Sequence, residues 1–117
     1  MGSHPAQPTP AALLELQGEG PVWGLASRDL NATLLAWSAG HTIAEHVNTE
    51  VDVLLVVIDG GGQVAVDGRQ HTLTRGSAVL IEKGSARQIR AGADGIRYLS
   101  VHRRRGPLQL TDARQDH

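Results

Sequence analysis

Glycine-marked turns separate short apolar segments along most of this chain, and this pattern constrains the fold more than any other feature. The 117 residues include 14 glycines, and glycine is the residue that tight turns accept most readily. Short strands joined by closely spaced turns are typical of β-sandwiches and β-barrels. Strands do not alternate with helical segments, so we do not expect a parallel α/β fold.

The expected strands are built mostly from Val, Leu, Ile and Ala, because only 3% of the chain is aromatic. They cover residues 22–26, 32–37, 52–58, 64–66, 70–73, 78–81, 86–90 and 96–102. The segment 52–58 is almost continuously apolar, as expected of a strand that is covered on both faces. Asp67-Gly68 predicts a tight hairpin. Residues 59–62 and the glycines at 76, 84 and 92 are expected to form turns.

The length allows one domain with a substantial core and is too short for two. We expect the barrel to cover residues 21–105, after an N-terminal arm at 1–20 and before a tail at 106–117. Within the arm, the sequence predicts a short helix at 10–16. A loosely packed arm is the alternative.

Charge and cysteine content exclude several classes of protein. The formal net charge is −1, so no overall charge favours binding to nucleic acid or to an anionic membrane. The chain has no Cys, which excludes disulfides, Cys-ligated zinc and thiol catalysis. No apolar run approaches the roughly 20 residues of a membrane span, and no segment resembles a signal peptide. We therefore expect a cytoplasmic protein with no nucleic-acid or membrane partner.

Two glycine-anchored motifs carry the residues that are most informative about chemistry. The first motif contains Gly40, His46, Asn48, Asp52 and Gly60, and the second contains Gly76, Glu82-Lys83-Gly84 and Arg87. This pair resembles the two signature motifs of the cupin family, over about residues 31–104, and the chain is similar to small single-domain bacterial cupins. The resemblance implies an all-β fold, the cupin-type double-stranded β-helix or jelly-roll barrel, with a pocket reached from one end.

The resemblance also points to a metal site whose ligand positions are altered. In the cupin family the first motif supplies two His and one Glu, and the second supplies one more His. The four corresponding positions here are His46, Asn48, Asp52 and Arg87. Imidazole is a good transition-metal ligand, an Asn carbonyl is a weak one, and a guanidinium cannot ligate at all. In one alignment with the cupin motif, Asp52 occupies the position of the Glu. In the other alignment, that position is occupied by Val53, which cannot bind a metal.

Two interpretations of these residues remain open. In the first, His46, Asn48 and Asp52 hold a divalent transition metal with water, helped by His41 or Glu50. His46 and Asn48 are two apart, and residues two apart on a strand point to the same face. In the second, Arg87 pairs with Asp52 and closes the former metal site. Its guanidinium is then also suited to an anionic ligand, either a carboxylate or a phosphate.

The last strand offers one further imidazole. His102 is in phase with Tyr98 and Ser100, whereas Leu99 and Val101 form the other face. The apolar pair is the more ordinary inward face. If the other face pointed inward, His102 would join the pocket.

We therefore expect a small-molecule-binding monocupin with a degenerate metal site. Its polar residues would be His46, Asn48, Asp52, Arg87 and His102, beside an apolar wall of Leu54, Val56 and Ile58. The alternative is a metal-dependent cupin enzyme of the dioxygenase, isomerase or lyase class that acts on a small organic acid. The sequence assigns no catalytic residue. A homodimer is expected, because the resemblance implies pairing through edge strands.

Overall fold

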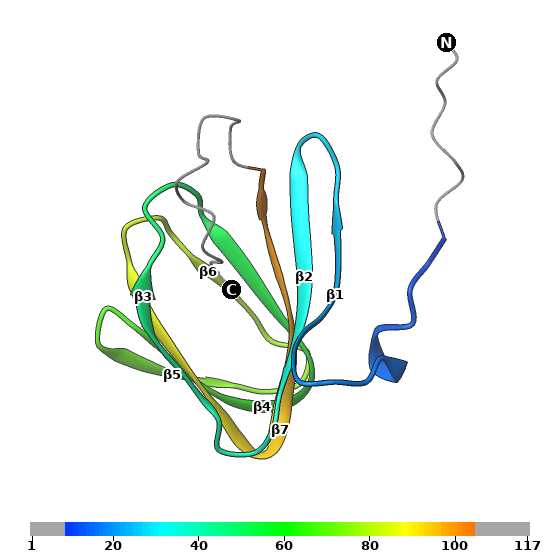
Figure 1. The fold of residues 1–117 in the computed structure, drawn as a ribbon. Helices are drawn as coiled ribbons and strands as arrows, with labels where there is room; N and C mark the ends of the chain where they lie inside the picture. The colour runs from blue at the N-terminus through cyan, green and yellow to red at the C-terminus, as the bar shows by residue number, and fades with distance from the viewer. Residues whose placement is uncertain (1–8, 105–117) are drawn as a thin grey trace.

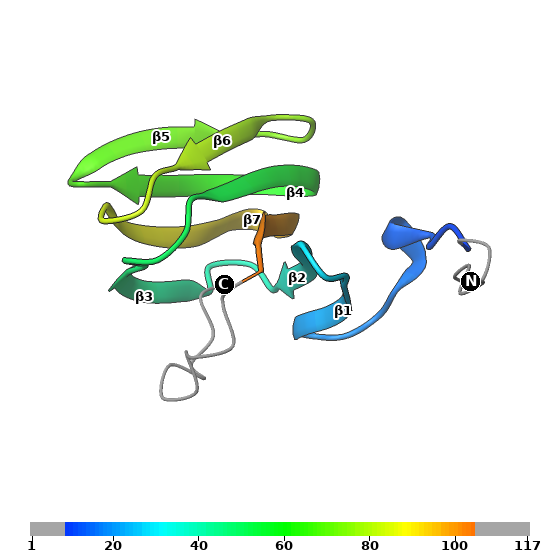
Figure 2. The ribbon, with the colours of Figure 1, turned by 90° about the horizontal axis from the view of Figure 1, so that it is seen from above.

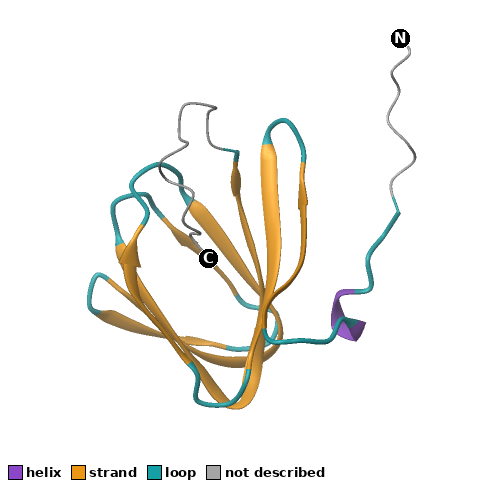
Figure 3. Ribbon diagram, viewed as in Figure 1, coloured by secondary structure: helices purple, strands orange, loops and turns teal. Residues whose placement is uncertain are grey.

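The computed structural model of this chain describes residues 9–104, which are almost entirely β (Figure 3). The elements are the 3-10 turn η1 (Leu13–Glu15) and the strands β1 (Gly20–Ala26), β2 (Leu30–Trp37), β3 (Thr42–Val47), β4 (Val53–Val66), β5 (Arg69–Leu73), β6 (Ala78–Ile81) and β7 (Ala86–Arg103). All strand pairs are antiparallel, and the strands curl into a barrel (Figure 1). Within the described residues, no helix is long and apolar enough to cross a membrane.

Two long strands, β4 and β7, belong to both walls of the barrel. They pair from Leu54↔Val101 to Val66↔Arg87. The first sheet has the order β1-β2-β7-β4-β6, and the second sheet has the order β3-β7-β4-β5. Figure 2 shows β3, β7, β4 and β5 lying side by side. The expected all-β barrel is confirmed.

Some expected strands are halves of longer ones. The expected strands 52–58 and 64–66 merge into β4, which begins one residue later at Val53, and residues 86–90 and 96–102 are parts of β7. Residues 59–62 lie inside β4 rather than in a turn, and register shifts between Val57 and Gly62 show where the strand bends. The Asp67-Gly68 hairpin is confirmed, since both residues have positive φ angles, 50° and 85°, as a type I′ turn requires.

Glycines permit this bend because backbone approaches backbone there. We call Gly60, Gly62 and Gly95 the glycine corner. A Cβ atom on Gly60 would overlap the carbonyl oxygen of Gly95, and one on Gly62 would overlap that of Arg90. Only glycine fits so close an approach. The corner therefore lets β4 and β7 stay paired as they pass from one sheet to the other.

The inner face of β4 is one residue out of phase with our expectation. Val53, Leu55 and Val57 are at most 1% exposed and belong to the main core cluster. The expected wall of Leu54, Val56 and Ile58 is therefore wrong. A strand that is apolar on both faces has no alternation from which its register can be read.

The N-terminal arm contacts the barrel through Arg97. Its Nη1 donates hydrogen bonds to the carbonyl oxygens of Leu13, at 3.2 Å, and Leu16, at 2.7 Å. The helix expected at 10–16 is reduced to η1, whose N-cap residue makes no side-chain capping bond, so the start of a longer helix lacks its usual stabilisation. The expected tail, 106–117, lies outside the described residues.

Gly62→Ala is expected to destabilise the fold by about 2–4 kcal/mol, because the new methyl group would push β4 away from the Arg90 carbonyl. Urea unfolding followed by circular dichroism measures the loss. Gly24→Ala in β1 is the matched control, since its Cβ would lie 3.2 Å from the nearest atom, the carbonyl oxygen of Ala32. Equal losses in the two variants would contradict the role of the corner.

Candidate functional site

The second sheet presents an imidazole and a guanidinium to the barrel interior. His46 of β3 is directly paired with Arg87 of β7, and Ile43 is paired with Ile89. Directly paired residues point to the same face of a sheet, and both Arg87 and Ile89 are 1% exposed. A bulge between Ile43 and His46 lets both side chains point inward although they are three residues apart.

The surroundings of His46 keep its imidazole neutral. Burial lowers the pKa of His46 below its ordinary value of 6.5, and the positive charge of Arg87 lowers it further. Nδ1 lies 3.4 Å from the carbonyl oxygen of Ala44. Nε2 is buried and has no hydrogen-bond partner among residues 9–104. A neutral ring that directs its Nδ1–H at Ala44 leaves an acceptor at Nε2.

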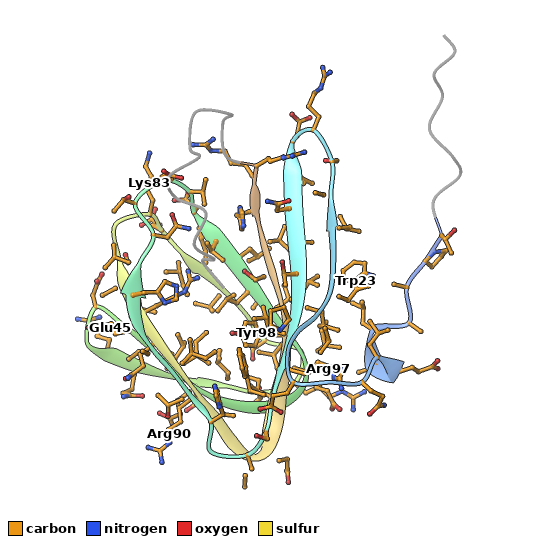
Figure 4. The ribbon with its side chains drawn as sticks, in the orientation of Figure 1. Trp23, Glu45, Lys83, Arg90, Arg97 and Tyr98 are labelled. Carbon is orange, nitrogen blue, oxygen red and sulfur yellow. The ribbon has the colours of Figure 1, made fainter. Side chains whose placement is uncertain are left out.

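Tyr98 faces the same interior from the first sheet (Figure 4). It is 0% exposed, and burial raises the pKa of its hydroxyl to about 12, against the opposing effects of the Trp37 hydrogen bond and the Arg87 charge. The indole Nε1 of Trp37 donates to the Tyr98 hydroxyl at 3.3 Å. Arg87 therefore acts electrostatically on groups of both walls.

Trp37 packs against the core cluster, and the exposed His41 lies against its ring. Their rings stack with centroids 4.3 Å apart and planes within 1°. Five residues separate His41 from His46, a spacing that places them on opposite faces of a regular strand. The bulge after Ile43 breaks this regularity, and no sequence signal marks its position.

Asn48 shapes a turn instead of reaching into the barrel with its oxygen. It lies just beyond β3 and is 6% exposed. Its Oδ1 accepts hydrogen bonds from the backbone N–H groups of Glu50, at 2.9 Å, and Val51, at 3.2 Å. These are the bonds of an Asx turn. Nδ2 is buried, and no described residue forms a hydrogen bond with it.

Asp52 lies outside the inner cluster. Its side chain is exposed, and its Oδ1 accepts a hydrogen bond of 2.9 Å from the backbone N–H of Lys83. An ion pair of Asp52 with the buried Arg87, the second of the two interpretations, gains no support from this exposed position. Val53 takes the inward position and is 0% exposed, because β4 follows the second of the two registers considered above.

The last strand turns its more polar face inward. Tyr98 and Ser100 are 0% and 3% exposed, so the expected inward face of Leu99 and Val101 is wrong. His102 follows in phase on the first sheet, paired with Asn31, and its Nδ1 lies 2.8 Å from the carbonyl oxygen of Arg103. It thus belongs to the wall opposite His46.

This set of donors does not fit a transition-metal centre. His46 offers one imidazole nitrogen, the Asn48 oxygen already accepts two N–H bonds, and Arg87 is a cation with no lone pair to donate. Across residues 9–104, no group of three or more His, Cys, Asp and Glu side chains is placed to hold an ion.

Two hollows lie away from the inner cluster. One, of about 450 Å³, has at its rim the side chains of Thr42, Gln63, Gln70, Gln88 and Arg90. The other, of about 220 Å³, lies at the glycine corner and includes Glu19, Asp59, Asp94 and Arg97. Neither contains the buried polar atoms that distinguish the inner cluster, so the inner face is the stronger candidate.

Solved structures with the same architecture include cupin proteins. KdgF from Halomonas sp. superposes with a TM-score of 0.67 at 19% identity, covering 75% of this chain and 81% of that chain. A cupin protein from Bacteroides fragilis gives 0.64 at 23% identity, covering 80% and 83%. The cupin domain of Cnp3 from Schizosaccharomyces pombe gives 0.66 at 13% identity, covering 80% and 71%. No protein-family model matches the sequence, and no curated protein matches it significantly. At these identities the likeness establishes the fold, and the predicted cupin fold is confirmed.

Replacing Arg87 by Met is expected to raise the pKa of His46 only part of the way to 6.5, since burial, the larger cause, remains. Imidazole NMR titration measures the shift. Arg90→Met, which removes an exposed guanidinium from the same strand, should leave that pKa unchanged. If the pKa of His46 were the same in the wild type and in Arg87→Met, the result would contradict the proximity of the two side chains.

The same lowered pKa predicts how stability depends on pH. The unfolded chain binds a proton at His46 more readily than the folded chain does. The contribution of His46 to stability is therefore complete above pH 6.5 and decreases as the pH falls through 6.5 toward the lower, folded-state pKa. Urea unfolding at several pH values should show a smaller decrease in His46→Gln. If the stability of His46→Gln decreased as much as that of the wild type, a lowered pKa at His46 would be refuted.

Proposed function

We propose that this cupin-fold protein binds a small organic anion on its inner face, with Arg87 as the anchor and His46 as a hydrogen-bonding partner. The observation that carries the proposal is the direct strand pairing of Arg87, which is 1% exposed, with His46, whose Nε2 is buried and has no hydrogen-bond partner within the described part of the chain.

The chemistry of Arg87 favours an anion. A guanidinium stays charged at any physiological pH, and its planar fork matches a carboxylate or a phosphate with two parallel hydrogen bonds. Such charge-assisted bonds are stronger in a buried environment than in water. A carboxylate or a phosphate is therefore the group that this side chain suits best.

His46 places a second requirement on the ligand. The neutral imidazole presents an acceptor at Nε2, which is suited to a hydroxyl or N–H group of the ligand. The inner walls around this pair are apolar, with Leu55, Val57 and Ile89 fully or almost fully buried. A ligand site commonly combines such apolar walls with a few convergent polar groups. We infer a small acid with a donor near its anionic group, such as a hydroxy acid.

Binding without a metal is the form of this function that the residues support. Metal-assisted catalysis needs several protein donors and an open coordination position, whereas His46 is the one ligand of the cupin set that this chain retains unchanged. A positive charge beside His46 also opposes the approach of a cation. The inner face therefore favours anion binding over the metal-dependent enzyme considered from the sequence.

Small hydroxy acids and phosphate are expected to raise the melting temperature. A ligand at ten times its Kd adds about 1.4 kcal/mol, or roughly 5–10 °C for a domain of this size. Differential scanning fluorimetry with lactate, citrate and inorganic phosphate measures the shift. Arg87→Met should abolish it, because the anchor is lost.

Arg90→Met is the matched control and should keep the full shift, since Arg90 is exposed. Circular dichroism establishes that both variants fold. A shift that survives in Arg87→Met, or that disappears in Arg90→Met, would reject Arg87 as the anchor.

A further inference from the structure

The outward side of the second sheet carries three glutamines around a small residue. Register pairs place Ala65 of β4 between Gln88 of β7 and Gln70 of β5, and Gln63 is two residues from Ala65 on the same face. Val64, between them in the sequence, is 0% exposed and belongs to the core cluster. Because side chains alternate along a strand, the glutamines point away from the barrel interior. We call these three glutamines, with Ala65 as their floor, the amide slot.

The amide slot is part of the hollow of about 450 Å³. Ala65 carries only a methyl group, and Gly62 and Gly92, which also line the hollow, carry no side chain. The long glutamine side chains therefore stand as walls above a low floor. The volume lies in the range of sites that hold small molecules.

The amides of the slot are available to a ligand. All three glutamines are exposed, and within residues 9–104 their amide groups form no side-chain hydrogen bond. Each amide offers two N–H donors and a carbonyl oxygen that accepts. The slot thus presents donors and acceptors in nearly equal measure, without a charge of its own.

This chemistry favours a neutral ligand with several hydroxyl groups. A hydroxyl both donates and accepts, so one amide can bond to two neighbouring hydroxyls of a sugar ring. An anion only accepts and would leave the amide carbonyls without a partner. An apolar ligand would find no aromatic or large aliphatic side chain among the lining residues. Arg90, the one charged residue of the lining, lies at the rim and points away from the barrel (Figure 4).

We propose that the amide slot binds a neutral saccharide through its hydroxyl groups. Gln70 and Gln88 lie on the strands to either side of β4, so their backbones are about 10 Å apart, which leaves room for a sugar ring above Ala65. The site is on the outer side of the sheet whose inner side carries Arg87. The proposal is therefore independent of the anion site.

NMR titration of the glutamine side-chain amides with glucose, maltose and galactose tests the proposal. At least one of these sugars should shift the amide signals of Gln63, Gln70 and Gln88 along one saturable curve. The midpoint is expected in the millimolar range, because each bond to a sugar replaces a bond to water at little net gain. Gln17, whose Nε2 donates to the carbonyl oxygen of Glu15 in the arm, should not respond, which separates binding from a general solvent effect.

Two substitutions in the slot sharpen the test. Ala65→Gln should abolish the response although it adds an amide, because the new side chain fills the floor. Gln70→Ala, at an exposed position, should weaken binding roughly threefold to tenfold. Ala26→Gln is the matched control, since Ala26 is exposed on β1 of the first sheet, and it should respond like the wild type.

Arg87→Met should also keep the response to sugars, because Arg87 faces the interior. Circular dichroism establishes that all variants fold. Glutamine signals that no sugar shifts, or that respond to inorganic phosphate and to no sugar, would overturn the proposal. A sugar response that persists unchanged in Ala65→Gln and Gln70→Ala would overturn it as well.

Discussion

Close backbone contact at the glycine corner is the constraint on which the rest of this structure depends. Gly60 and Gly62 lie against the carbonyl groups of Gly95 and Arg90, so β4 and β7 can bend together without losing their pairing. The N-terminal half of β7 therefore carries Arg87 into the second sheet, and the C-terminal half forms part of the first. One strand thus supplies both walls of the site, and a larger residue at the corner would disturb both.

The buried charge of Arg87 is the basis of the proposed anion site. The cupin resemblance places a metal-binding His at this position, and the guanidinium reverses the sign of the charge that is favoured there. His46 responds with a lowered pKa, and the charge also opposes the rise in the pKa of Tyr98. Both side chains are therefore neutral at pH 7, and Arg87 supplies the positive charge among the three.

The sequence predicted the architecture well, because turn signals such as Asp67-Gly68 act locally and need no knowledge of packing. The structure pairs His46 of β3 directly with Arg87 of β7, two residues that the glycine-anchored motifs had singled out. The prediction failed on β4, because apolar residues on both faces of this strand conceal which face points inward. Asp52 was placed among the pocket residues, whereas Val53 takes the inward position. The bulge in β3 and the Asx turn at Asn48 depend on local hydrogen bonds that residue spacing does not reveal. The same two-sided apolar character of β4 places Leu54 and Val56 on the outward side of the sheet.

The most direct measurement is ¹⁵N NMR of the His46 imidazole and the Arg87 guanidinium in two titrations, one with citrate and one with Ni²⁺. If Arg87 anchors an anion, citrate should shift both signals along one saturable curve, and an equimolar amount of Ni²⁺ should leave them unchanged. Selective broadening of His46 by equimolar Ni²⁺, with no response of Arg87 to citrate, would contradict an anion site and restore a metal at this position.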